Sequence, residues 1–127
     1  MKSPERRGWP RLIAAWHHSC AGLRDVWRRE EAFRLETAVL ALAIPTAFWL
    51  GSTLSQIALL IGSLLLLMIV EIMNSAIEAI VDRIGLERHE LSRVAKDLGS
   101  AAVLLTALFP LSIWGSIALN RLGLINI

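Results

Sequence analysis

The stretch that decides the fold runs from Thr37 to Val70 and reads TAVLALAIPTAFWLGSTLSQIALLIGSLLLLMIV, without one charged side chain. About 20 apolar residues cross the hydrocarbon core of a bilayer, so this stretch is too long for a single span. Gly51-Ser52-Thr53 interrupts it with residues that favour a turn. We therefore predict two membrane spans joined at this turn, over residues 32–50 and 54–81.

The rest of the chain adds one more span and an orientation. Leu98–Asn120 is also uncharged, and we predict a third span over residues 97–120 of a single membrane domain, 1–127. Of the 13 lysines and arginines, eight precede residue 35 and four lie between Arg83 and Lys96. Basic clusters can indicate nucleic-acid binding, but the apolar runs between them favour membrane topology, and we expect no nucleic-acid partner. Basic segments stay in the cytoplasm, which places the N-terminus and the Arg83–Lys96 loop there.

Residues 9–29 have a different pattern. Apolar residues, including Trp16 and Trp27, recur at roughly helical spacing, with arginines such as Arg24 among them. A basic amphipathic helix with tryptophans typically lies in the membrane interface. The pattern fits a simple surface anchor and a substrate-gathering helix equally well. The single cysteine, Cys20, excludes an internal disulfide.

A polar stripe marks the end of the second span. Glu71, Asn74, Glu78 and Asp82 are spaced by 3, 4 and 4 residues, which places them on one helix face. Glu71 directly follows the uncharged run, where a carboxylate costs at least a few kcal/mol. Glu71 and Asn74 could join helices by hydrogen bonds; alternatively, Glu71 and Glu78 could divide the roles of base and cation ligand. Asp82 and Arg83 are expected to be solvated interfacial charges.

The loop that follows carries further polar residues. Lys96 begins the third span, where it could contact a phosphate or reach to the interface as a solvated charge. His89 alone is typical of an exposed histidine. These patterns indicate a membrane enzyme or a protein that handles protons or ions.

Several motifs resemble the small bacterial integral-membrane diacylglycerol kinases. The motif EIMNSAIE at residues 71–78, continued by VDRIG at 81–85, resembles the family signature. Similar blocks are HELS at 89–92, AKD at 95–97, GSAAV at 99–103, and Glu30 with residues 32–34 and Glu36. The resemblance extends from about residue 11 to residue 114 without a gap.

The resemblance implies an all-α integral membrane fold, with three transmembrane helices and an N-terminal amphipathic surface helix, assembled as a homotrimer. It implies transfer of the ATP γ-phosphate to diacylglycerol within the membrane lipid, with Mg²⁺ as cofactor. It also implies a multi-pass protein of the bacterial inner membrane whose N-terminus is cytoplasmic.

The resemblance implies site residues by position. Glu71 would be the general base, Glu30 and Glu78 would hold the metal, and Asn74 would support them. The nucleotide would be bound by Arg11, His18, Glu30, Glu78, Glu87, Arg88, His89, Lys96 and Asp97. The lipid substrate would be bound by Arg11, Arg24, Trp27, Ala32, Phe33, Arg34, Glu36, Trp49, Glu71, Ser100 and Trp114.

The sequence departs from the family at a few positions. His18 stands where the family commonly has a tyrosine, Arg88 replaces an aromatic residue, and Ile57 occupies a position that can be basic. An undecaprenol kinase of the same family is the nearest alternative function. A non-catalytic membrane subunit or proton relay would explain Glu71, but would leave Glu30, Glu78 and Lys96 without a shared purpose.

Overall fold

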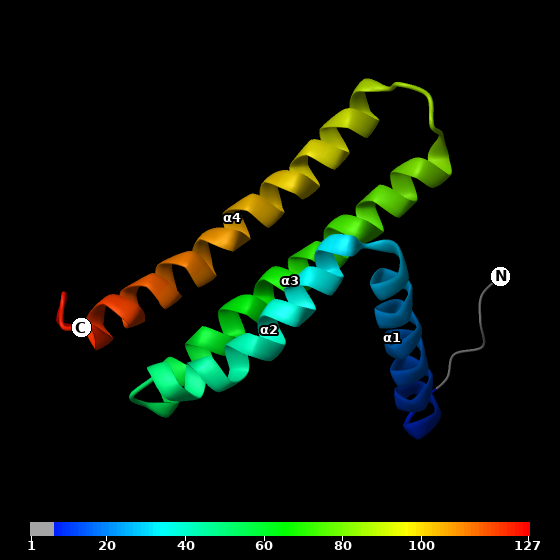
Figure 1. The fold of residues 1–127 in the computed structure, drawn as a ribbon. Helices are drawn as coiled ribbons and strands as arrows, with labels where there is room; N and C mark the ends of the chain where they lie inside the picture. The colour runs from blue at the N-terminus through cyan, green and yellow to red at the C-terminus, as the bar shows by residue number, and fades with distance from the viewer. Residues whose placement is uncertain (1–6) are drawn as a thin grey trace.

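The structure is a computed structural model that describes residues 7–127. Its four helices are α1 (Trp9–Arg29), α2 (Glu31–Leu50), α3 (Leu54–Ile84) and α4 (Glu90–Arg121) (Figure 1). Helices α2, α3 and α4 are each long and apolar enough to cross a membrane. The prediction of an all-α membrane protein with three transmembrane helices is confirmed.

The turn between α2 and α3 is defined by local hydrogen bonds. Thr53 caps α3, since its hydroxyl accepts a bond from the Gln56 backbone N–H at 3.2 Å. The Gln56 side chain in turn accepts a bond from the backbone N–H of Ser52 at 2.8 Å. This exchange resembles a capping box and fixes where α3 begins. Gly51 is needed beside it, because a Cβ there would lie 2.7 Å from Cγ1 of Ile57.

Helix α3 is the centre of the bundle. It packs against α4 along one side and against α2 along the other, whereas α2 and α4 barely meet (Figure 1). Near the α2–α3 turn, Ala47, Leu50, Leu60 and Ile117 form a small buried cluster. Trp114 of α4 adds a polar link to it, because its indole N–H donates to the carbonyl of Leu60 at 3.0 Å.

Most apolar side chains on these helices are exposed. The exposed fractions are 69% for Leu104 and 71% for Leu111 of α4, and 74% for Leu42 of α2. Surfaces of this kind suit lipid or another protein chain and not water. The sides of one chain therefore require lipid or another protein chain to cover them.

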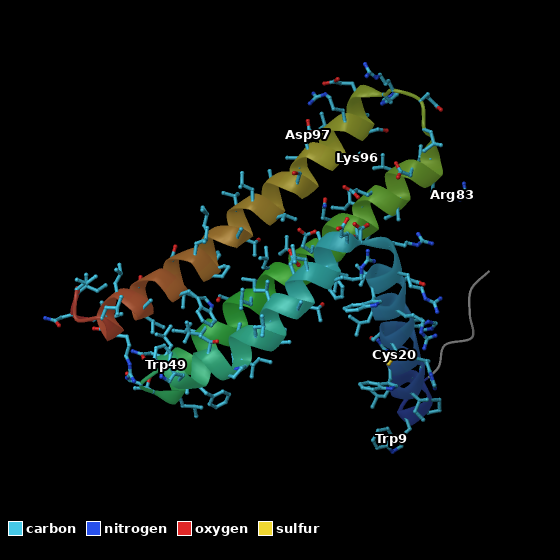
Figure 2. All side chains as sticks on the ribbon, viewed as in Figure 1. Trp9, Cys20, Trp49, Arg83, Lys96 and Asp97 are labelled. Atoms are coloured by element: carbon cyan, nitrogen blue, oxygen red, sulfur yellow. The ribbon has the colours of Figure 1, made fainter. Side chains whose placement is uncertain are left out.

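The helices extend beyond the predicted spans at the polar end. Helix α3 continues to Ile84 and α4 begins at Glu90, before the predicted span start at residue 97. An uncharged run marks only the part of a helix that suits hydrocarbon, and the backbone stays helical through the charged turns outside it. Trp49 lies at the opposite end of the bundle from Lys96 and Asp97 (Figure 2).

Candidate active site

Helix α3 carries the core of the candidate site. It is continuous from Leu54 to Ile84, so Glu71, Asn74, Glu78 and Asp82 share one face, as predicted. Glu71, Asn74 and Glu78 are half-buried, while Asp82 is exposed. With a rise of 1.5 Å per residue, Glu78 lies about 10 Å from Glu71 along the helix axis. The stripe therefore leads from the apolar part of α3 to its polar end.

Carboxyl groups from α2 and from the α1–α2 junction join this stripe. The carboxyl group of Glu36 contacts that of Glu71, and the charges of Glu30 and Glu78 both act on Glu71. Acidic side chains from three parts of the chain thus lie within electrostatic range of Glu71, and that of Glu36 is in contact with it. Like charges at such a place repel unless a proton or a cation is shared among them. The cluster is suited to binding a cation and to accepting a proton.

Two polar atoms at this cluster have no protein partner. Oε2 of Glu36 and Oδ1 of Asn74 are buried without a hydrogen-bond partner among residues 7–127. Buried polar atoms are normally hydrogen-bonded, so unpaired ones call for an explanation. Such oxygens are the ligands that Mg²⁺ prefers. Within residues 7–127, no group of three or more acidic, histidine or cysteine side chains is placed to hold a metal ion.

Asn74 faces a glycine on α4. A Cβ at position 99 would collide with Oδ1 of Asn74, and Gly99 itself is buried. The glycine allows α3 and α4 to approach closely at the level of the carboxylate cluster. Gly99 therefore leaves space for the amide of Asn74, a role that the sequence motif GSAAV did not reveal.

Lys96 of α4 reaches across to α3. Its ammonium donates to Oδ1 of Asp82 at 2.8 Å and lies within electrostatic range of Glu78. Asp82 is exposed, as predicted, and it also pairs with Lys96. The structure therefore brings Lys96 to the acidic stripe, as its assignment to the phosphate site requires.

A polar cleft of about 690 Å³ opens at this end of the bundle. It lies between the end of α3, the α3–α4 loop and the start of α4. Four of the residues assigned above to the nucleotide line it, namely Glu87, Arg88, His89 and Lys96, and so does Asp82, the partner of Lys96. The cleft adjoins the stripe, because Glu78 lies one turn before Asp82 on α3.

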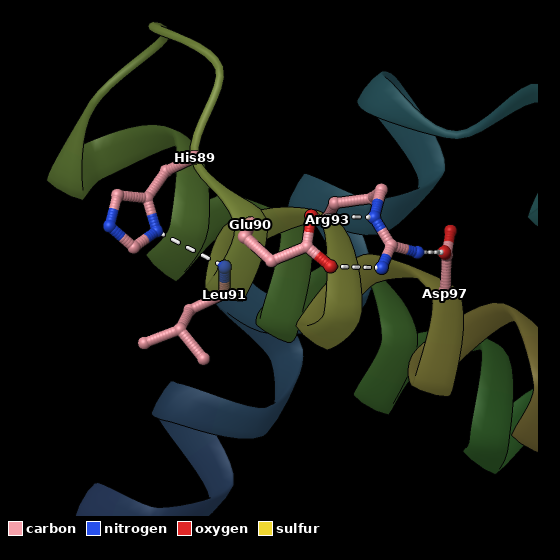
Figure 3. Close-up of polar contacts among 5 residues, drawn as sticks. All are labelled: His89, Glu90, Leu91, Arg93 and Asp97. Atoms are coloured by element: carbon pink, nitrogen blue, oxygen red, sulfur yellow. Dashed lines mark hydrogen bonds and ion pairs between the residues drawn. The ribbon is translucent and has the colours of Figure 1, made fainter.

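The first turns of α4 are tied together by side chains. His89 caps the helix, since its Nδ1 accepts from the backbone N–H of Leu91 at 3.1 Å (Figure 3). Arg93 bonds both Glu90 and Asp97, at 2.6 Å from Oδ2 of the latter (Figure 3). Arg93 also lines the cleft and was missed by the sequence reasoning, although its spacing of three and four residues from the two acids could have predicted the pairs.

Other predicted residues lie away from the carboxylate cluster of the same chain. Helix α1 leaves the bundle at Glu30, and its main contacts are with α2 (Figure 1). Arg11, His18 and Arg24 therefore do not meet the cluster within one chain. Trp49 lies at the far end of the bundle, where the Arg121 guanidinium stacks on it at 5.8 Å from the ring centre (Figure 2).

An apolar groove of about 720 Å³ runs along the bundle in the membrane region. Helices α2, α3 and α4 all contribute, with Leu42, Leu67, Leu111 and Trp114 among the lining residues. Of the residues predicted to bind lipid, Trp114 lies in this groove, while Phe33 is buried and Ser100 is exposed. The groove is suited to an extended hydrocarbon chain.

The sequence of the chain matches a known family. The family model for prokaryotic diacylglycerol kinase matches residues 17–118. The chain belongs to the prokaryotic diacylglycerol kinase family. It is 48% identical to the diacylglycerol kinase of Escherichia coli strain K12 over 116 residues, which cover 91% of this chain and 95% of that protein.

Two further relatives in this family have similar coverage. The Haemophilus influenzae diacylglycerol kinase is 46% identical over 110 residues, 87% of this chain and 93% of the relative. The Pseudomonas aeruginosa diacylglycerol kinase is 44% identical over 113 residues, 89% of this chain and 92% of the relative. The family match at residues 17–118 covers all of α2 and α3 and most of α1 and α4.

The close approach of Gly99 to Asn74 predicts that a side chain at position 99 would impair the site. We expect Gly99→Ala to displace the Asn74 amide and to lower lipid phosphorylation by up to about 10²-fold, the effect of a misplacement near 1 Å. The helix itself should not suffer, because alanine is the better helix former. Gly62→Ala on α3 is the matched control, since a Cβ there meets nothing within 4 Å. Equal turnover by the two variants, measured in the same micelles, would remove the Asn74 amide from the site.

Proposed function

We propose that this protein is an ATP-dependent diacylglycerol kinase, which transfers the γ-phosphate of ATP to the free hydroxyl of diacylglycerol and yields phosphatidic acid and ADP. The observation that carries the proposal is the carboxylate cluster at the polar end of apolar helices, next to a polar cleft. A lipid hydroxyl lies at the membrane interface, and ATP arrives from water. Membership of the diacylglycerol kinase family supports this substrate pair.

Glu71 is the base in this proposal. It lies deepest of the three acidic groups on the α3 stripe, nearest the apolar part of the helix. The Glu71 carboxylate accepts the hydroxyl proton as the lipid oxygen attacks the γ-phosphorus, and the bond to the β–γ bridging oxygen breaks as ADP leaves. Glu36 contacts Glu71 and holds its carboxyl group in place. General-base catalysis of this kind contributes typically about 10²–10⁴-fold.

The cleft at the end of α3 and α4 is the proposed nucleotide site. Lys96, Arg88 and His89 provide donors to phosphate oxygens around it. Lys96 can exchange its Asp82 partner for a phosphate, because the pair is partly exposed. Phosphoryl transfer depends mainly on positioning and on charge stabilisation, and this arrangement supplies both.

Glu30 and Glu78 are proposed to hold Mg²⁺, with Asn74 as their neighbour. The unpaired Oδ1 of Asn74 and the excess of carboxylate oxygens fit a hard cation. Mg²⁺ usually takes one or two carboxylates and completes its shell with water and substrate phosphates. When bound, the ion would neutralise charge on the transferring phosphate. Glu30 makes no cap hydrogen bond to α2, so its carboxylate is available for this role.

The lipid chains are proposed to lie along the apolar groove, with the hydroxyl at Glu71. Assembly as a homotrimer would let a neighbouring subunit bring Arg11, His18 and Arg24 to the cluster, since α1 of the same chain does not. Exposed apolar faces on all three spans are compatible with such contacts. The basic loop at residues 83–96 supports an orientation in the inner membrane with this loop and the N-terminus in the cytoplasm.

A direct comparison of lipids tests the function. Purified protein in mixed micelles receives ATP labelled in its γ-phosphate, with either diacylglycerol or undecaprenol. We expect labelled phosphatidic acid to form much faster than labelled undecaprenyl phosphate. Preferential labelling of undecaprenol would reassign the substrate to the polyprenols, and no labelling of either lipid would favour a non-catalytic subunit or proton relay.

Mixed trimers test whether the site is shared between subunits. Subunits carrying Glu30→Gln are combined with subunits carrying Glu71→Gln, each inactive by itself. Because the charge of Glu30 acts on Glu71 within one chain, we expect every site in the mixture to carry one lesion and the activity to stay lost, with heterotrimers present. Return of part of the activity would mean that Glu30 of one chain serves Glu71 of another, and would contradict this placement of the two carboxylates.

A further inference from the structure

Arg34 occupies an unusual place at the bend between α1 and α2. It lies in the first turn of α2, where the positive end of the helix dipole disfavours a cation. Its Nη1 donates instead to the carbonyl of Trp27 at 2.7 Å and reaches that of Arg28 at 3.4 Å. These carbonyls belong to the last turn of α1. The last carbonyl groups of a helix have no hydrogen-bond partner within the helix.

Arg34 therefore joins the two helices across a single residue. Glu30 is the only residue between α1 and α2, and its backbone is extended, with φ −111° and ψ 108°. Val26 before the bend and Phe33 after it are buried at 7% and 6% exposure. The guanidinium supplies the polar half of the junction, because basic side chains can close the last carbonyls of a helix.

The bend fixes where the carboxylate of Glu30 lies. The side chain of Glu30 makes no capping bond of its own, and its charge acts on Glu71. Any change in the angle between α1 and α2 requires a change in the backbone dihedral angles of Glu30, because Glu30 is the single residue between the two helices. Arg34 makes a side-chain hydrogen bond across this bend, to the carbonyl of Trp27.

We propose that Arg34 is a positioning residue, which closes the C-terminus of α1 and thereby holds Glu30 at the metal end of the carboxylate cluster. This inference rests on the proposed function, and it replaces the direct contact with lipid or phosphate that the family resemblance suggested for Arg34. Loss of the Arg34 hydrogen bonds should therefore weaken Mg²⁺ binding and leave the binding of the lipid unchanged.

Kinetics separate the two roles. Arg34→Met keeps the length of the side chain and removes the donors. We expect it to raise the Mg²⁺ concentration for half-maximal activity by about tenfold, the size of one charge-assisted hydrogen bond, and to change the KM for diacylglycerol by less than about twofold. Arg34→Lys should recover most of the wild-type Mg²⁺ dependence, because a lysine also bonds terminal carbonyls. Arg29→Met is the matched control for loss of a charge beside the bend.

A second measurement does not depend on catalysis. Spin labels at positions 21 and 41 of a Cys20→Ser chain, diluted with unlabelled chains, report the distance between α1 and α2. We expect a narrow distribution for the wild type, Arg34→Lys and Arg29→Met, and a broader one for Arg34→Met. If Arg34→Met does not assemble, Arg34→Leu, which also lacks the donors, carries both measurements.

Two results would overturn the proposal. One is an unchanged distance distribution in the variant that lacks the donors. The other is a rise in the KM for diacylglycerol without a change in Mg²⁺ dependence, which would mean that Arg34 contacts the lipid. A wild-type protein that phosphorylates no lipid would contradict the proposed function instead, and the distance measurement would still decide whether Arg34 holds the bend.

Discussion

Acidic side chains at the edge of a membrane raise the free energy of the folded protein. The contacts around them in this structure offset part of that cost. Glu71 follows a run of 34 uncharged residues, 37–70, and Glu36 reaches it from α2. A carboxylate in such a place costs at least a few kcal/mol. Grouping four of them raises the cost through repulsion, unless protons or cations are shared. The cluster therefore lowers the stability of the fold. The same grouping of carboxylates is suited to binding a cation beside a proton acceptor.

Neighbouring contacts keep the cluster in shape. Gly99 lets α4 approach α3 beside Asn74, and Lys96 places a positive charge at the outer end of the acidic stripe. Arg34 closes the end of α1 beside Glu30. These contacts come from all four helices, although few residues of the single chain are buried. Packing within one chain is sparse in the apolar region, where most of the large apolar side chains are exposed.

Much of the fold and part of the site could be predicted from the sequence, for physical reasons. Uncharged runs of membrane-spanning length and the turn at Gly51–Thr53 are local properties, and they predicted three spans. The spacing of Glu71, Asn74 and Glu78 follows helical geometry, so their common face was also predictable. The pair between Lys96 and Asp82, the space left by Gly99 and the bonds of Arg34 depend on how helices meet. No local pattern encodes these contacts.

Glu71 is proposed to accept the proton of a lipid hydroxyl, and a comparison of two rates tests this role. The measurement is phosphatidic acid formation at saturating ATP, Mg²⁺ and diacylglycerol by Glu71→Gln, with the exposed Glu31→Gln as control. We predict that Glu71→Gln loses about 10²–10⁴-fold in kcat, while Glu31→Gln keeps the wild-type rate and both variants assemble normally. A correctly assembled Glu71→Gln protein with near-normal kcat would contradict the account.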